Sequence, residues 1–253
     1  MALEIVFVER PIDDPLMGDQ LWSEVDQIGS LPADVRQKLN EMGFCVGRVG
    51  ANPPRALQTL MGLSMEVGNQ KEKRLVGRRV VLPSGAETEV MTGRPLIQSK
   101  INVPTAKGME VKTFENVHGV FRLKAKQLQD GWARIEFLPE VHHGRLVNRP
   151  VVVQGGWQLQ TAQAIERLYG RQFALDLNLG EMVVITGNFE PEDSVGRHFF
   201  HGNEYSDAND PNLQNPSEQP PPESQLDNSP GIQRLLIVRL ADLSTAESIY
   251  SEK

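Results

Sequence analysis

Two neighbouring stretches of alternating residues, 117–126 and 132–138, constrain the fold of this chain more than any other feature. Successive side chains of a β-strand point to opposite faces of the sheet, so alternation separates a core face from a solvent face. The second stretch divides into a mixed face and a wholly apolar face: Trp132, Arg134, Glu136 and Leu138 on the first, and Ala133, Ile135 and Phe137 on the second. The intervening Asp130-Gly131 favours a turn, and Pro139 has no N–H to donate to a neighbouring strand. The sequence therefore predicts a central antiparallel hairpin that ends at Pro139.

The remaining patterns predict an α+β fold. A small strand and helix module over residues 1–70 precedes a mainly antiparallel β domain, built of hairpins, over residues 71–202. Apolar residues at three- and four-residue spacing indicate helices, and alternating runs bounded by Gly turns indicate strands. In the module these are strands over 3–9 and 44–49 and helices over 19–28, 32–42 and 53–63. In the β domain they are hairpins of 79–82 with 88–91 and of 173–179 with 182–186, strands over 96–103 and 149–153, and a short helix over 158–168.

The segment over residues 203–231 differs in composition from the rest of the chain. It holds six prolines, six acidic residues and no Lys or Arg. Such a segment cannot bury enough apolar surface to offset the entropy of ordering, so we expect a disordered loop. The run over 234–240 is again apolar, and we expect residues 232–253 to form the last strand of the β domain and a tail.

Composition argues against a membrane-spanning helix, because no run approaches the roughly 18 apolar residues that one needs. The first residues carry Glu4 and Glu9 and lack the basic and long apolar regions of a signal peptide. The chain as given is therefore expected in the cytoplasm, whereas a leader upstream of Met1 would place it in the periplasm or outer membrane. The single cysteine, Cys45, lies in an apolar run and is expected to be a core residue.

The charge distribution does not favour a nucleic-acid partner. The net charge is −7, and the segment over 203–231 alone contributes −6, so the rest of the chain is nearly neutral. A basic stretch over residues 71–79 contains Glu72 and no aromatic residue. Because phosphate binding needs several convergent cations, we expect this stretch to be solvated surface.

Sequence motifs for catalysis are absent. The chain has no nucleophile elbow, metalloprotease helix, phosphate loop or dinucleotide fingerprint. Glu136 and Glu140 are four residues apart near a proline and are expected to face solvent. The sequence therefore predicts a protein that is not an enzyme and that needs no cofactor.

The histidines offer an alternative. His198 and His201 are three residues apart, which suits one turn of a helix, and Glu204 or His142 could supply a third ligand. His142 and His143 cannot both reach one ion from a strand, because adjacent side chains point to opposite faces. A weak candidate zinc site at His198 and His201 follows, and with it a soluble metal- or ligand-binding protein or a hydrolase.

An ordered series of short patterns resembles the core domain of the secretins, the outer-membrane channels of type II and type III secretion. ALEIVFVER at 2–10 resembles the strand that opens that domain, VVLPSGAETEVMTGRPL at 80–96 a hairpin, and RLLIVRL at 234–240 the last strand. FENVHGVFRLKAKQLQDGWARIEFLPEV at 114–141 is similar to the central hairpin, LGEMVVITG at 179–187 to a later one, and SVGRHFF at 194–200 to a Gly-then-Phe element. On this resemblance the motif positions are structural: Gly119, Asp130, Gly131, Pro139, Glu140, Gly187 and Gly196.

The resemblance implies a distant, non-channel relative that is a structural or assembly protein, linked to the secretion machinery of the envelope. Such a protein would bind a protein partner, or itself, by pairing exposed strand edges. The first and last predicted strands, over 3–9 and 234–240, are apolar and carry few charges. If either lies at a sheet edge, it is the expected place of self-association.

Overall fold

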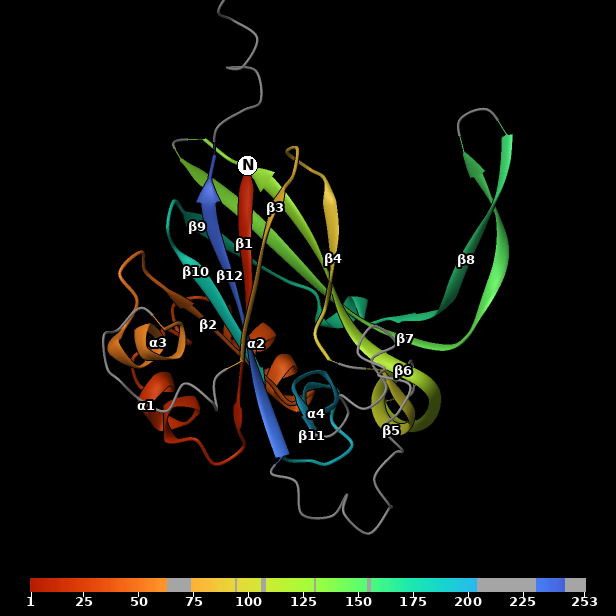
Figure 1. The fold of residues 1–253 in the computed structure, drawn as a ribbon, viewed down its shortest axis with the longest axis horizontal. Coiled ribbons are helices and arrows are strands. Elements are labelled where there is room, and N and C mark those ends of the chain that lie inside the picture. Colours follow the sequence, from red (N-terminus) through yellow and green to blue (C-terminus); the bar gives the residue numbers. More distant parts are fainter. Residues whose placement is uncertain are drawn as a thin grey trace, which may run out of the picture.

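The structure is a computed structural model that describes residues 1–62, 74–93, 95–105, 108–129, 131–153, 156–203 and 231–243. These residues form two mainly antiparallel sheets packed on one another, with short helices at one side and one end (Figure 1). Among them, no helix is long and apolar enough to cross a bilayer. The coarse prediction of an α+β fold dominated by antiparallel sheet is confirmed.

The first sheet has the strand order β2-β10-β12-β1-β3, and β11 also pairs with β12. The bounds are β1 (Ala2–Pro11), β2 (Phe44–Val49), β3 (Arg74–Val81), β10 (Met182–Gly187), β11 (His201–Asn203) and β12 (Gly231–Asp242). β1 lies between β12 and β3, and β12 lies between β10 and β1. Neither the first nor the last strand is therefore a sheet edge, so the condition set for self-association at these two strands is not met. β1 and β2 share this sheet with β10 and β12, so the residues before 70 and the later strands contribute to one core.

The second sheet has the order β4-β6-β7-β8, with β5 also on β6 and β9 also on β7. The bounds are β4 (Glu87–Met91), β5 (Leu96–Thr105), β6 (Gly108–Gln127), β7 (Trp132–Val153), β8 (Gly156–Arg167) and β9 (Phe173–Asn178). The predicted central hairpin is the pairing of β6 with β7, which begins at Gln127 opposite Ala133. Its predicted apolar face is confirmed, because Ala133, Ile135 and Phe137 are all 0% exposed.

Pro139 does not end its strand, contrary to the expectation, since β7 continues to Val153. The carbonyl of Pro139 accepts a hydrogen bond from the N–H of Leu168, at 3.0 Å. The N and carbonyl of one strand residue point to the same side, so the missing N–H of Pro139 faces away from β6. The β6–β7 ladder therefore loses no hydrogen bond at this proline.

Two predicted hairpins and one predicted helix are wrong. In place of the hairpin of 79–82 with 88–91, β3 pairs with β1 and β4 pairs with β6. In place of the hairpin of 173–179 with 182–186, β9 pairs with β7, and β10 pairs with β12 and β2. The two strands of each expected hairpin therefore belong to different sheets. The expected helix over 158–168 lies almost wholly in β8. Its three-residue apolar spacing fits a helix, but pairing with β7 overrides that local preference.

The core lies between the two sheets, and a second apolar cluster lies on the outer face of the first sheet. β12 contributes to both clusters, because its side chains alternate between the two faces of the sheet. Leu236 and Val238 enter the core between the sheets, and Leu235 and Ile237 enter the outer cluster, so all four are 0% exposed. The outer cluster is covered by α1 (Asp19–Trp22), α3 (Arg55–Leu60) and the 3-10 turn η1 (Pro15–Met17). α2 (Ala33–Glu41) and α3 confirm predicted helices, whereas the helix predicted over 19–28 is only the single turn α1.

The outer parts of β7 and β8, residues 144–153 and 156–165, leave the body of the molecule as a two-stranded ribbon, called here the hairpin arm (Figure 1). β6 stops pairing with β7 at His142, and a register shift follows between His143 and Val147. Asn116 of β6 has a φ of 47° and Gly144 of β7 a φ of 79° at this point. The two strands of the arm therefore pair with each other but with no third strand among the described residues.

Candidate functional site

Three of the predicted structural glycines lie around α4 (Val195–Phe200), which closes one end of the core. A Cβ on Gly196 would lie 2.0 Å from the carbonyl oxygen of Gly43, and one on Gly187 would lie 2.1 Å from the carbonyl oxygen of Gly196. A Cβ on Gly119 would lie 2.4 Å from the ring of Phe199. Because real Cβ atoms do not approach this closely, only glycine lets the backbones pack here.

Of the remaining predicted structural residues, Pro139 and Glu140 lie in β7, and Gly131 directly precedes it. Gly131 has a φ of 82°, which only glycine adopts readily, and begins the turn into the strand. Asp130 lies outside the described residues, as do Glu204 and nearly all of the segment over 203–231. Pro139 and Glu140 follow in the middle of β7, and Glu140 is the functional candidate with the most distinctive surroundings.

Glu140 is not solvent-facing, contrary to the expectation, because its side chain is 0% exposed. Oε1 accepts hydrogen bonds from Nε of Arg122, at 2.9 Å, and from Nε of Arg167, at 3.0 Å. Oε2 accepts from Nη2 of Arg122, at 3.1 Å, and from Nε2 of His142, at 2.9 Å. A carboxylate offers about four acceptor positions, and all of them are used.

The strand register builds this group into a ladder of alternating charge. Glu89 of β4 stands opposite Arg122 of β6, and their Oε1 and Nη2 atoms are 2.6 Å apart. Glu140 of β7 stands opposite Arg167 of β8. Four strands are thus joined on one face of the sheet by four side chains of alternating sign. We call Glu89, Arg122, Glu140 and Arg167 the charge ladder.

The ladder keeps Glu140 ionised. Burial alone would raise the pKa of this carboxyl, but the hydrogen bonds from His142, Arg122 and Arg167 outweigh it and lower the pKa to about 2. The hydrogen bond to Glu140 in turn raises the pKa of Arg122. A carboxylate with so low a pKa and no free acceptor position is a poor general base.

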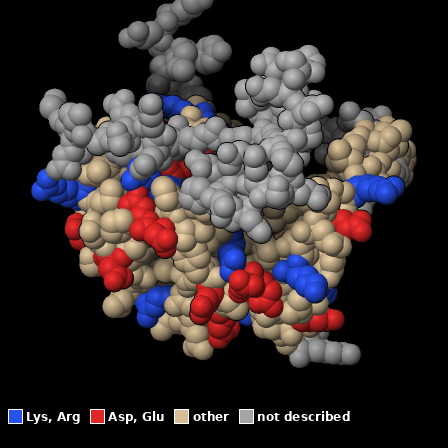
Figure 2. Space-filling model, turned by 60° about the horizontal axis from the view of Figure 1, so that its bottom comes forward, with Lys and Arg blue, Asp and Glu red and all other residues tan. Residues whose placement is uncertain are grey.

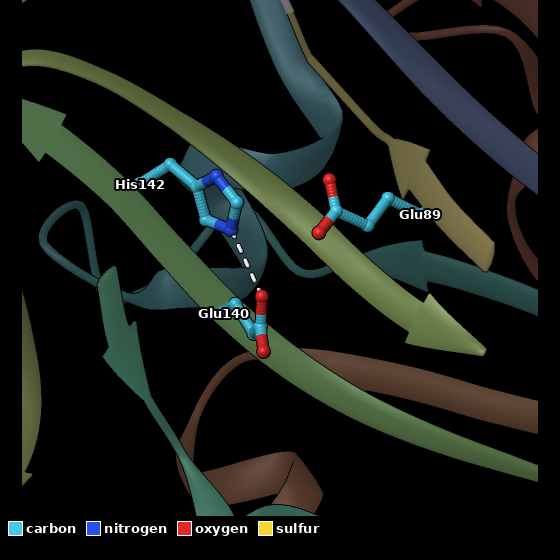
Figure 3. A group of neighbouring side chains, drawn as sticks. All are labelled: Glu89, Glu140 and His142. Atoms are coloured by element: carbon cyan, nitrogen blue, oxygen red, sulfur yellow. Dashed lines mark hydrogen bonds and ion pairs between the residues drawn. The ribbon is translucent and has the colours of Figure 1, made fainter. Parts of the chain in front are cut away.

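Glu89, Glu140 and His142 are the described residues whose arrangement comes nearest to a metal site. One ligand atom of each lies within 4.8 Å of the others, and Figure 3 shows the three side chains turned toward one another from β4 and β7. However, Arg122 bonds to both carboxylates, and Arg167 adds a second positive charge. A divalent cation would have to displace Arg122, so this arrangement suits a structural ion-pair network better than a metal.

His118 borders the ladder. It stands opposite His142, with ring centroids 5.3 Å apart. Burial and the neighbouring His142 lower its pKa, and its buried Nδ1 has no partner among the described residues. The pair extends the polar row along β6 and β7 toward the root of the hairpin arm.

His198 and His201 do not converge in the way a zinc site requires. His198 lies in α4, where Nε2 is 2.9 Å from the carbonyl oxygen of Lys100. His201 follows the helix, and its Nε2 is 2.9 Å from the carbonyl oxygen of Gly187. Burial lowers the pKa of both rings. Each Nε2 donates to the backbone, so the two histidines fasten α4 to β5 and to the end of β10.

Acidic and basic side chains lie next to one another on the face shown in Figure 2. Elsewhere on the second sheet, Arg134 and Asp176 form a two-bond pair with distances of 2.7 and 2.8 Å. Cys45 is half-buried, and burial raises the pKa of its thiol. A thiol of raised pKa is a weak nucleophile.

Sequence reasoning missed Arg122, Arg167 and Glu89. A signal existed for one part of the ladder, since Glu140 and His142 are two apart and share a face if the strand continues through Pro139. Arg167 gave no such signal, because its segment reads as a helix. Only the register of β7 with β8 brings it opposite Glu140.

Comparisons with protein-family models, with curated proteins and with solved structures find no match to this chain. The function of the chain therefore has to follow from its own residues and their arrangement.

Proposed function

We propose that this chain is a non-enzymatic assembly protein that joins other β-structured subunits through the hairpin arm. The secretin-like series of patterns, in which β6 and β7 form the central hairpin, supports a role in a secretion assembly of the envelope. The observation that carries the proposal is the exposed apolar surface of the arm.

The arm displays large apolar side chains to solvent. Leu146, Trp157 and Leu159 are 68%, 76% and 69% exposed. Trp157 and Leu159 are two apart on β8 and therefore share one face. A two-stranded ribbon is only marginally stable in water, and contiguous exposed apolar side chains are typical of protein interfaces. Contact with another subunit would cover these side chains and add strands to the ribbon.

The charge ladder supports this role by fixing the root of the arm. The pair of Glu140 with Arg167 is the first in the β7–β8 register, and Arg122 ties Glu140 to β6. A ribbon anchored in this way keeps its direction relative to the body, which reduces the entropy lost on binding. The charge ladder therefore has a structural role, and it does not support the alternative that the protein is a hydrolase.

Sedimentation velocity over a wide concentration range tests the proposal. The wild type should associate, and a Trp157→Ser/Leu159→Ser variant should associate much more weakly. Ile97→Ser/Val111→Ser is the matched control, because Ile97 and Val111 are exposed on the other hairpin, formed by β5 and β6. A wild type that is strictly monomeric at high concentration and retains no protein in a pull-down would contradict the proposal. Stoichiometric zinc in the purified protein would instead favour the metal-binding alternative.

A further inference from the structure

The edge strands of the two sheets differ in how they are protected. Exposed edges are normally guarded against pairing with another chain by charged residues, proline or bulges. Five of the described edges carry charges: β2 has Arg48, β3 has Arg78 and Arg79, β4 has Glu87 and Glu89, β5 has Lys100, and β9 has Asp176. Arg78 also donates to the carbonyl oxygen of Glu89, at 2.6 Å, so β3 partly covers the edge of β4.

β8 lacks these guards. From Gly156 to Ile165 it reads GWQLQTAQAI, with no charged residue and no proline. It pairs with β7 on one side and with no other described strand. Its first charged residues, Glu166 and Arg167, lie at the root of the arm. β11 (His201–Asn203) is also uncharged but has only 3 residues, so β8 is the edge best suited to accept another strand.

We propose that β8 pairs antiparallel with β8 of a second copy of this chain across a two-fold axis. This inference rests on the proposed function and names its partner and its contact strand. The pairing would join two hairpin arms into one four-stranded sheet, in the order β7-β8-β8-β7.

Charge is the reason for choosing a second copy. A two-fold axis places each region of a strand opposite the same region of its partner. At each of the five guarded edges this places charges of the same sign in the same region of the contact, and like charges on cross-strand neighbours are destabilising. The uncharged run of β8 meets no such repulsion.

The sequence of β8 also selects a register. A two-fold axis perpendicular to the sheet keeps side chains on the same face, so a residue on the axis lies opposite itself. With Thr161 on the axis, Trp157 lies opposite Ile165 of the second copy, and every residue from 157 to 165 has an uncharged partner. An aromatic side chain opposite a β-branched one is a favourable cross-strand pair.

Charge exchange at Thr161 tests the pairing. Thr161 is exposed, so its replacement should leave the monomer folded, which circular dichroism checks. Thr161→Lys and Thr161→Glu should each raise the dissociation constant of self-association about five- to tenfold, because like charges would lie about 5 Å apart. An equimolar mixture of the two variants should recover association. Thr161→Ala should associate like the wild type, although it loses the hydrogen bond from Thr161 to Asn148.

Thr113→Glu is the matched control for Thr161→Glu, since Thr113 is an exposed threonine on β6 within the other hairpin and stands opposite Lys100. It should leave self-association unchanged. If the wild type self-associates but Thr161→Glu and Thr113→Glu behave alike, or if the mixture does not recover association, the β8 pairing is wrong while the assembly role stands. The same conclusion follows if the arm binds a different protein and not a second copy. A monomeric wild type without any partner overturns both.

Discussion

Replacing Glu140 by Gln should destabilise the protein more than any other conservative change on the outer face of the second sheet. The substitution keeps the size of the side chain but removes the charge that Arg122 and Arg167 both contact. It also places an amide N–H₂, a donor, against groups that themselves donate. Arg122 would keep Glu89 as a counterion, but it would lose its buried one, and Arg167 would lose the carboxylate that it contacts.

The magnitude follows from the ionisation of the carboxyl. Glu in an unfolded chain has a pKa of about 4.3, and in the folded protein the pKa of Glu140 falls to about 2. By linkage this difference corresponds to roughly 3 kcal/mol of folding free energy at pH 7. Arg167 is 41% exposed, so solvent screens its share. We therefore expect a loss of about 2–3 kcal/mol.

The pH dependence has a definite sign. Because folding lowers the pKa of Glu140, the stabilisation is complete above the unfolded pKa and is lost as the pH falls through the folded pKa. The difference in unfolding free energy between wild type and Glu140→Gln should stay constant from pH 7 to about 5 and shrink to about half at pH 3. Below about pH 2 it should largely vanish.

Urea unfolding at several pH values measures this difference. Glu136→Gln is the control, because Glu136 lies on the same face of β7 and its one side-chain hydrogen bond among the described residues is a 3.5 Å contact from Nε2 of Gln172. If Glu136→Gln costs as much as Glu140→Gln, or if the difference is the same at pH 7 and pH 3, the account of the ladder is refuted.

Other substitutions test the core and the close packing around α4. Ile135→Asp should prevent folding, because burying an unpaired carboxylate costs several kcal/mol against a total stability of roughly 5–15 kcal/mol. Arg134→Ala on the opposite face should cost little, and equal sensitivity of the two would show that both faces are buried. Gly196→Ala should destabilise by roughly 1–3 kcal/mol, because the new Cβ meets the backbone of Gly43. Gly50→Ala should be tolerated, since a Cβ added at Gly50 would meet no neighbouring atom within 4 Å. The melting temperatures of Gly196→Ala and Gly50→Ala, measured by thermal unfolding, compare the two variants.

The candidate site was only partly predictable. Alternation correctly placed Ile135 and Phe137 in the core, because that pattern depends only on the two-residue period of a strand. The same pattern, carried through Pro139, would have placed Glu140 and His142 together. Their burial was not predictable, since it depends on arginines from strands that are distant in sequence. His198 and His201 were assigned to a candidate metal site because their spacing is compatible with one. The carbonyl oxygens that they contact belong to residues distant in sequence, so these contacts could not be predicted from the spacing.

The sequence by itself determined that this chain is mostly antiparallel sheet, where the central hairpin begins, and which of its residues face the core. These features depend on local periodicity and on the backbone preferences of Gly and Pro. The tertiary structure decided which strands are neighbours: it placed β1 and β12 inside a sheet, sent the strands of two expected hairpins to different sheets, and turned a helix-like segment into β8. Pairing between distant strands has this power because it satisfies backbone hydrogen bonds and buries side chains together, and these gains exceed the small differences in local preference.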